Sequence, residues 1–370
     1  MTARDRVLAA LSHESTDRVP WNIELTSEEE RKVRAALDSV ATEAGSSCHR
    51  GPGLGRPGLA GPGRVGPGRV GTGADFSWFD EYAGNHIDKA TYNIGGSHIE
   101  AGVFRDEYGV VWDRRGLDKD IGVVRGLVFP EPDFADYSFS LPDPEAIGTA
   151  TLAMLERKDG RFKLGKIGLA YFERAWSLRG MENLLMDFYL NPEFAEALFA
   201  KVLEHNLAIL DVALRYDIDG VYFGDDYGQQ TGMIMGPPLW RRFIKPGLAA
   251  MFAKVKEAGK IVALHSCGDI SEIYGDLIEI GLDVHQTFQP EIYDIGKIKR
   301  EYGKRLSFWG GISTQHMLPF LSPTELIAAT RELVELMSVG GGFIAAPTHR
   351  VPADVPAENI IALVDYFHGR

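Results

Sequence analysis

Residues 220–269 read GVYFGDDYGQQTGMIMGPPLWRRFIKPGLAAMFAKVKEAGKIVALHSCGD, and this stretch decides the fold. Two apolar runs, Gly220–Gly224 and Ile261–His265, lie on either side of Pro238–Ala258, in which apolar residues recur with helical spacing. A strand, a helix and a second strand in this order predict two parallel strands joined by a right-handed crossover. The stretch therefore predicts one unit of an α/β fold.

The same alternation continues on both sides of this unit. Further apolar runs occupy residues 162–170, 284–288, 306–309 and 343–346, and further helical stretches occupy residues 192–216, 270–280 and 322–338. These units, together with a short strand expected at Trp21–Leu25, approach the eight of a closed (β/α)8 TIM barrel. A doubly wound open sheet is the alternative, but it usually has a glycine-rich phosphate-binding turn after its first strand, and none is present.

Two segments near the N-terminus interrupt the barrel pattern. Residues His98–Phe104 and Val110–Trp112 flank the turn Asp106–Gly109, which predicts a hairpin within an excursion over residues 97–130. Residues 45–74 are rich in glycine and proline and repeat Gly-Pro-Gly-Arg-Val in tandem. Such a segment cannot bury enough apolar surface to offset its ordering entropy, so we interpret it as a disordered insertion or an artefact of the gene sequence. Residues 1–370 otherwise form one predicted domain.

The composition is that of a globular enzyme, with 45% hydrophobic and 25% charged residues and a formal charge of −13. That charge disfavours binding to nucleic acid or to an anionic membrane surface. We find no run of about 18 apolar residues and no apolar leader at the N-terminus, so we expect neither a membrane span nor a signal peptide. Two cysteines in 370 residues do not suggest a disulfide framework. We therefore expect a cytoplasmic protein.

Polar residues follow the predicted strands at the points where each strand ends. Asp225 and Asp226 follow one strand, His265 and Cys267 end the next, Glu291 follows another, and His349 follows the last. In a β/α barrel these ends meet at one face, where active sites lie. The pattern therefore predicts an active site at this face.

His265 and Cys267 form the most informative pair. Residues i and i+2 of an extended segment point to the same side, so an imidazole and a thiolate can face one metal ion. A catalytic zinc needs a third protein ligand, for which His349 is the candidate and Glu291, Asp225 or Asp226 are alternatives. Alternatively, Cys267 is a small buried apolar residue and His265 a hydrogen-bonded core residue.

The remaining candidates are assigned by residue type and position. We expect catalytic acids or bases at Asp225, Asp226 and Glu291, with only one of the two adjacent aspartates facing the site. The residues expected to bind substrate lie in the predicted strands and are Asn22, Glu24, Tyr222, Gln286 and Trp309. For the aromatic residues among them, packing within the barrel is an equally good interpretation.

Several motifs together resemble the uroporphyrinogen decarboxylase superfamily. The resemblance covers nearly all of the chain except about 43–78 and implies a β/α barrel. It rests on residues 4–11, 17–20, 221–230, 234–237 with Trp240, 265–270, 289–291, 308–313 and 347–356 with Glu358 and Asn359.

The superfamily includes cofactor-free decarboxylases of the haem pathway and zinc- and corrinoid-dependent methyltransferases. The decarboxylases carry an N-terminal arginine-rich segment that binds substrate carboxylates, whereas Arg18–Leu25 here contains Glu24 and lacks those arginines. The methyltransferases are similar in a His-x-Cys pair followed by a later cysteine. His265 and Cys267 match the pair, and the later position falls near His349, which departs from the pattern.

The first hypothesis is therefore a zinc-dependent methyltransferase that moves a methyl group between a small methylated compound, such as a methoxylated aromatic, and a corrinoid carried by a partner protein. The second is a lyase that decarboxylates a carboxylated ring. That hypothesis predicts cationic residues in the barrel mouth, and the sequence offers few. The third is a non-catalytic binding barrel.

Overall fold

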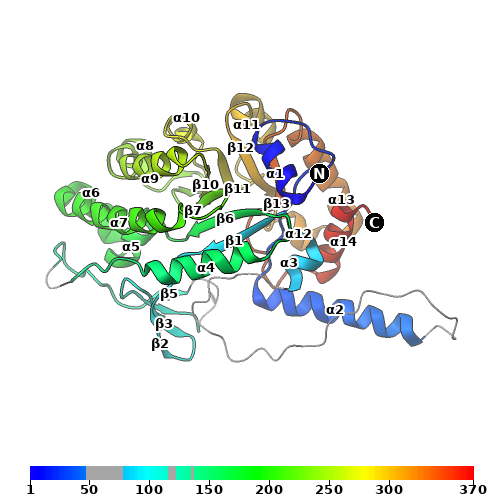
Figure 1. Ribbon diagram of the computed structural model, residues 1–370, viewed down its shortest axis with the longest axis horizontal. Helices are drawn as coiled ribbons and strands as arrows, with labels where there is room; N and C mark the ends of the chain where they lie inside the picture. The colour runs from blue at the N-terminus through cyan, green and yellow to red at the C-terminus, as the bar shows by residue number, and fades with distance from the viewer. Residues whose placement is uncertain (47–77, 116–121, 135–136) are drawn as a thin grey trace.

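A computed structural model describes residues 1–46, 78–115, 122–134 and 137–370 (Figure 1). The predicted insertion at 45–74 lies outside the described residues, except for the two residues that end helix α2 (Ser27–Ser46). Within the described parts of the chain, no helix combines the length and the apolar character that a membrane span requires.

The core of the fold is a seven-stranded parallel sheet in the order β1-β6-β7-β10-β11-β12-β13. Helices flank this sheet on its outer side (Figure 1). The strands are β1 (Ile87–Thr91), β6 (Phe162–Ile167), β7 (Gly220–Gly224), β10 (Ile261–His265), β11 (Val284–Phe288), β12 (Ser307–Ile312) and β13 (Phe343–Pro347). The helices are α1 (Ala3–Leu11), α3 (Trp78–Ala83), α4 (Pro144–Glu156), α5 (Phe172–Arg179), α6 (Met181–Leu190), α7 (Pro192–Ala213), α8 (Gly236–Leu239), α9 (Lys245–Glu257), α10 (Tyr274–Glu279), α11 (Ile295–Tyr302), α12 (Met317–Phe320), α13 (Pro323–Met337) and α14 (Ala357–His368).

The segment 20–26 occupies the place where an eighth strand was expected. Trp21 forms an isolated parallel bridge with Ala345 of β13, and the Asn22 N–H donates to the Ala345 carbonyl at 3.0 Å. On the other side, the His86 N–H, just before β1, donates to the Trp21 carbonyl at 3.0 Å. The structure thus confirms a TIM-like parallel sheet of seven strands. The irregular segment is hydrogen-bonded to the edge strand β13 and to His86, the residue that precedes the other edge strand, β1.

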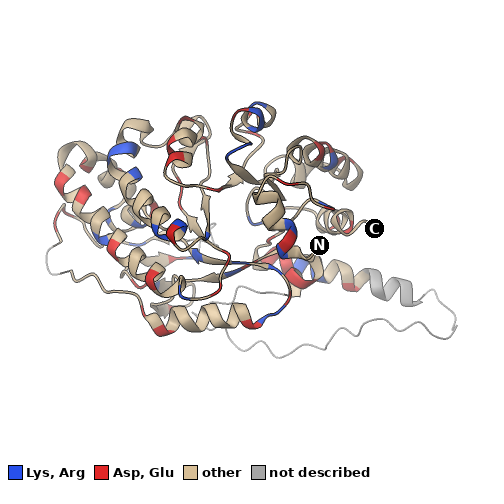
Figure 2. Cartoon of the chain, turned by 45° about the horizontal axis from the view of Figure 1, so that its top comes forward, with Lys and Arg blue, Asp and Glu red and all other residues tan. Residues whose placement is uncertain are grey.

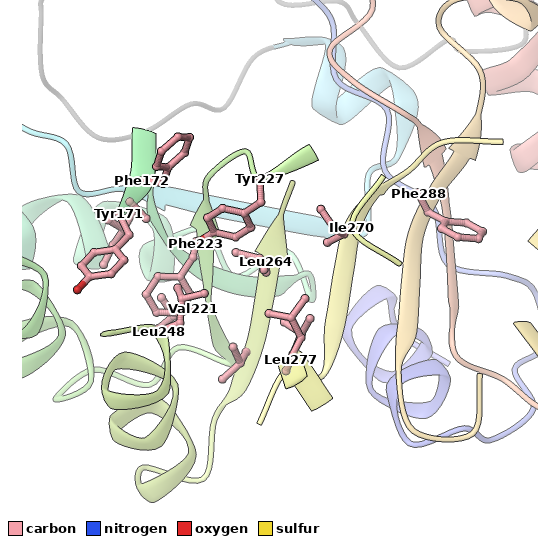
Figure 3. Close-up of a cluster of buried hydrophobic side chains, with 14 of the residues drawn as sticks. Tyr171, Phe172, Val221, Phe223, Tyr227, Leu248, Leu264, Ile270, Leu277 and Phe288 are labelled. Carbon is pink, nitrogen blue, oxygen red and sulfur yellow. The ribbon is translucent and has the colours of Figure 1, made fainter. Parts of the chain in front are cut away.

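Side chains of the strands alternate between two cores, as the two-residue period of a strand requires. Tyr222 of β7 points to the inner side of the sheet, where it packs with Trp309 and Leu164. Its neighbours Val221 and Phe223 point to the outer side and pack near Leu248 of α9 (Figure 3). The inner side is therefore where polar residues at the carboxyl ends of the strands come together.

Strand β1 was not expected from the sequence, because Asp88 and Lys89 break its apolar run. Both polar residues have partners in the fold. Asp88 accepts from Arg157 at 2.7 Å and from Lys163 at 2.9 Å, and Lys89 pairs with Glu24 on the inner side. Ion pairing thus allows two charged residues in a strand that is mostly buried.

The predicted hairpin is confirmed as part of an antiparallel sheet in the order β2-β3-β4-β5. The run 98–104 is not one strand, because a turn at Gly102, with φ of +75°, divides it. Asp106 and Arg174 of α5 form a buried ion pair at 2.6 Å that attaches this sheet to the barrel helices. The strands are β2 (Ser97–Glu100), β3 (Val103–Arg105), β4 (Val111–Asp113) and β5 (Val123–Val124).

Charged residues of both signs are interspersed along the outer helices (Figure 2). Glu29 of α2 differs from them, because it is fully buried and its oxygens accept no hydrogen bond from the residues that the structure describes. Lys32 lies 3.3 Å away, but its ammonium donates to the carbonyl of Ala353. Burial raises the pKa of Glu29 to about 7, although Lys32 lowers it.

Glu29 should therefore make folding stability depend on pH. Its folded pKa of about 7 exceeds the ordinary value of 4.5, so its stabilising contribution is fully present below pH 4.5 and is lost as the pH rises towards 7. We expect Glu29→Gln to raise the free energy of unfolding at pH 8 by about 1–3 kcal/mol, with little effect at pH 4.5. Denaturant unfolding at both pH values measures this. The exposed neighbour Glu28 supplies the control variant Glu28→Gln, and equal stability of wild type and Glu29→Gln at pH 8 would contradict the prediction.

Candidate metal site at the carboxyl ends of the strands

Two imidazoles and a thiol converge where β10 and β13 end. Within the described part of the chain, one ligand atom each from His265, Cys267 and His349 lies within 4.8 Å of the others. His265 Nε2 is 3.5 Å from Cys267 Sγ, and the rings of His265 and His349 are 5.8 Å apart. Nitrogen and sulfur donors in this number suit a catalytic zinc site, which keeps a fourth position open. These residues could therefore bind a metal ion.

The neighbouring Gln286 fixes which ring nitrogen of His265 carries the hydrogen. The Gln286 Oε1 accepts hydrogen bonds from the Tyr222 hydroxyl, at 2.8 Å, and from His265 Nδ1. Because Nδ1 must carry the hydrogen in this arrangement, the lone pair of the neutral ring lies on Nε2, which faces Cys267. Such an outer hydrogen bond fixes the orientation of a ligating histidine. Gln286 and Tyr222, both expected to bind substrate, thus contact a candidate metal ligand.

The loop that carries Cys267 is held by backbone contacts. The Tyr227 N–H donates to Ser266 Oγ at 3.0 Å, and the Gly268 N–H donates to Gln289 Oε1 at 2.9 Å. Gly268 has φ of +76°, and a Cβ there would lie 2.1 Å from the carbonyl carbon of Gly228. Glycine is therefore required for the turn that presents the thiol.

The adjacent aspartates have different surroundings, as the alternation of a strand predicts. Asp226 Oδ1 accepts from the Cys267 N–H at 2.7 Å and lies 3.5 Å from His265 Nε2. Asp225 is fully buried and points towards α5, where it accepts from the N–H groups of Phe172 and Glu173 at 2.8 and 2.7 Å. The structure therefore places Asp226, and not Asp225, beside the metal-binding group.

A third carboxylate at this site, Glu173, was missed by the sequence analysis. Burial raises the pKa of Glu173 well above its usual value, and the charges of Asp226 and Asp225 raise it further. Burial also raises the pKa of the Cys267 thiol, and Asp226 and Glu173 add to this effect. Glu173 follows β6 at the start of α5, so it was hidden within a helix rather than at an obvious strand end.

The charges of the site fit a cation. The side chain of His349 is exposed at the edge of the site, but desolvation of its ring by the surrounding protein lowers its pKa, and the neighbouring His265 lowers it further. A neutral imidazole is the form that binds a metal. The thiol of Cys267 lies among carboxylates, which oppose its ionisation unless a cation is present. The donor set therefore matches zinc better than it matches a free reactive thiolate.

Glu291 is not part of the metal-binding group. It follows β11, and both carboxylate oxygens are buried without a hydrogen-bond partner in the described part of the chain. Burial raises the pKa of Glu291, while His316 lowers it. A carboxyl group in such surroundings favours the protonated form, so Glu291 is better suited to be an acid than a zinc ligand.

A second polar cluster lies on the inner side of the sheet around Glu24. Lys89 forms an ion pair with Glu24, Arg350 Nε lies 3.7 Å from Glu24 Oε2, and the Asn22 amide donates to Glu24 at 2.8 Å. Burial raises the pKa of Glu24, but the charges of Lys89, Arg350 and Lys166 outweigh it and lower the pKa overall. The expectation of few cations at this end of the barrel was therefore wrong, because three surround one carboxylate.

Two aromatic rings connect this cluster with the metal-binding group. The Tyr222 and Trp309 rings are 5.6 Å apart, and Lys89 Nζ lies 5.3 and 5.4 Å from their centroids. The Tyr222 ring is also 6.3 Å from that of His265. The structure thus brings together all the expected substrate-binding residues, while their role in binding stays a prediction.

One solved structure that is similar over the full length agrees with the fold. Over its full length the chain is similar to the solved structure of a methyltransferase from Methanosarcina mazei, with a TM-score of 0.71 and 18% identity over 100% of this chain and 99% of that chain. A D-psicose 3-epimerase from Clostridium cellulolyticum H10 is more distantly similar, with a TM-score of 0.38 and 14% identity over 81% of this chain and 89% of that chain.

No curated protein matches the chain in sequence. The family described as uroporphyrinogen decarboxylase (URO-D) matches residues 146–370, which include β6 to β13 and all three candidate metal ligands. More than half of the chain is covered by this match, and the remainder completes the same parallel sheet. The chain therefore belongs to the uroporphyrinogen decarboxylase family.

Proposed function

We propose that this protein is a zinc-dependent methyltransferase that moves a methyl group between a small methylated compound and a corrinoid carried by a partner protein. The observation that carries the proposal is the convergence of His265, Cys267 and His349 at the carboxyl ends of the strands. A decarboxylase that works without a cofactor does not need two imidazoles and a thiol at one point. We also infer that the segment 20–26 completes a (β/α)8 barrel as its eighth strand.

The roles of the chain's own residues follow from their contacts. His265, Cys267 and His349 would hold zinc, which supplies Lewis-acid chemistry towards the atom that carries or accepts the methyl group. Gln286 keeps the lone pair of His265 on Nε2. Glu173, whose pKa is raised well above its usual value, favours the neutral form and is suited to give a proton to a leaving oxygen.

The aromatic pair supports a planar substrate. Tyr222 and Trp309 are both buried, and each presents a ring to the inner side of the sheet. A methoxylated aromatic ring could lie against such surfaces. Lys89, beside both rings, would attract a carboxylate on that ring.

The cations around Glu24 favour a second candidate, a lyase that acts on a carboxylated ring. Lys89, Lys166 and Arg350 supply the positive charges that such a substrate requires. This candidate leaves the purpose of the His-x-Cys pair unexplained, so we place it second.

A methyl-transfer assay separates the two candidates. We expect the zinc-loaded protein to convert free cob(I)alamin to methylcob(III)alamin in the presence of a methoxylated benzoate, with at least about a hundredfold loss in His349→Ala because a metal ligand is removed. The absorption spectrum of the corrinoid reports the reaction. His98→Ala is the matched control, because His98 is an exposed histidine of β2 that lies outside the metal-binding group. Consumption of uroporphyrinogen without any change in the corrinoid would instead support the lyase.

A further inference from the structure

A cavity of about 440 Å³ lies at the amino-terminal ends of the strands, opposite to the candidate metal site. Its four arginines come from separate segments: Arg6 from α1, Arg18 from the loop before the segment 20–26, Arg161 from just before β6, and Arg370 from just after α14. His86, just before β1, also lines it. A cavity of this size is within the range that small-molecule ligands occupy.

One of these arginines, Arg18, has no charged partner in the described ranges of the chain. Among the residues that the structure describes, Arg18 forms no ion pair, and its guanidinium donates to the Phe367 carbonyl at 3.4 Å. Arg6, by contrast, binds both oxygens of Asp17, at 2.7 Å each. A guanidinium has five N–H donors, so Arg18 keeps most of its capacity for another acceptor.

Carboxylates near the cavity are already shared among cations. Asp159 lies 3.5 Å from Arg161 and also accepts from Lys163 at 2.8 Å. Asp17, the partner of Arg6, also faces the N-terminal ammonium group at 3.8 Å. The residues that line the cavity include four arginines and one aspartate, so positive charge exceeds negative charge there, although the whole chain carries a formal charge of −13.

The lowered pKa of His86 is consistent with an excess of positive charge around the cavity. The ring is 3% exposed, and its Nδ1 accepts from the Trp21 N–H at 2.9 Å. Burial lowers the pKa of His86 to about 3, and the charges of Arg6, Arg18 and Arg161 contribute to that shift. The positive charges of three guanidinium groups thus all reach the His86 ring in the cavity wall.

We propose that this cavity binds a small polyvalent oxyanion, with a phosphate or diphosphate group as its recognised part. Guanidinium groups match the geometry of phosphate oxygens and form charge-assisted hydrogen bonds with them. Such an anion would neutralise the excess charge and connect α1, the loop 17–20 and the start of β6. The cavity lies at the end of the sheet away from the metal site, so its occupant is an effector or structural ligand rather than the methyl donor.

Titration calorimetry and thermal unfolding, with inorganic phosphate and pyrophosphate at constant ionic strength, test the proposal. We expect pyrophosphate to bind with a Kd of about 1 mM or tighter and to raise the Tm by mass action. Arg18→Ala should weaken binding about tenfold or more, because one charge-assisted contact is lost. Asp17→Asn should strengthen binding, because it frees Arg6 from a competing carboxylate.

Three controls make the outcome decisive. Arg242→Ala, at an exposed arginine that does not line the cavity, should bind like the wild type. Cys267→Ser should also bind like the wild type, which separates this cavity from any pyrophosphate that attaches to zinc. The Tm of each variant without anion shows whether it is folded. The proposal is overturned if the wild type shows no binding at millimolar pyrophosphate, or if Arg18→Ala and Asp17→Asn bind it as the wild type does.

Discussion

Cys267→Ser is expected to abolish stoichiometric zinc binding and, with it, methyl transfer. Wild-type protein purified with zinc should retain about one equivalent per chain, because three protein ligands suffice for a catalytic site. The thiol supplies one of three donors that lie within 4.8 Å of one another, and a hydroxyl is a much weaker donor to zinc. The loss in zinc affinity should exceed the about 10–100-fold loss that follows removal of an outer hydrogen-bond partner. Elemental analysis after dialysis measures it.

Two further measurements make this prediction specific to the proposed site. Cobalt-substituted wild-type protein should show a thiolate-to-cobalt absorption band that Cys267→Ser lacks. The chain's other cysteine supplies the matched control, Cys48→Ser, which should keep both the metal and the band. If Cys267→Ser retains its zinc equivalent while His265→Ala and His349→Ala do the same, the metal mechanism is wrong, and the lyase becomes the better candidate.

The part of the fold that the sequence predicts best is the region after residue 162. There most strands have a mainly apolar run and each crossover a helical pattern, because a parallel sheet covered on both faces leaves little room for polar residues. Strands β6 and β11 are less regular, since β6 contains two lysines and β11 contains His285, Gln286 and Thr287. The prediction fails at β1, where Asp88 and Lys89 interrupt the run. Ion pairs that form only in the folded chain make these residues acceptable, and a local pattern cannot reveal partners such as Arg157 or Glu24.

The same reasoning applies to the site. The spacing of His265 and Cys267 places both on one side of an extended segment, so the sequence alone brings them together. His349 joins them only through the arrangement of the sheet, which the structure supplies. Lys166 could have been found, because it follows Phe162 and Leu164 on the same face of β6 at a spacing of two. Glu173 could not, since nothing in its helical pattern distinguishes it from a solvent-facing residue.

Substitutions at Asp225 and Asp226 are expected to have opposite consequences, although the two residues are adjacent. Asp225 accepts three backbone N–H groups at the start of α5 and the Tyr227 hydroxyl at 2.8 Å, all away from the metal-binding group. Asp225→Ala leaves these donors buried without an acceptor. We expect it to lower the free energy of unfolding by about 2–4 kcal/mol, as measured by denaturant unfolding.

Asp226→Ala should instead change the free energy of unfolding by less than about 1 kcal/mol, because Asp226 is only partly buried. Its carboxylate orients the Cys267 N–H and lies 3.5 Å from His265, so its loss should weaken zinc binding about 10–100-fold in a competition with a chelator. Asp226→Asn keeps an oxygen acceptor and should recover part of that affinity. If Asp225→Ala were stable but inactive, while Asp226→Ala were unstable, then Asp225 would be the residue that takes part in the chemistry. In that case the assignment of Asp226 to the metal-binding side and of Asp225 to the helix side, which rests on the alternation of side chains along a strand, would be wrong.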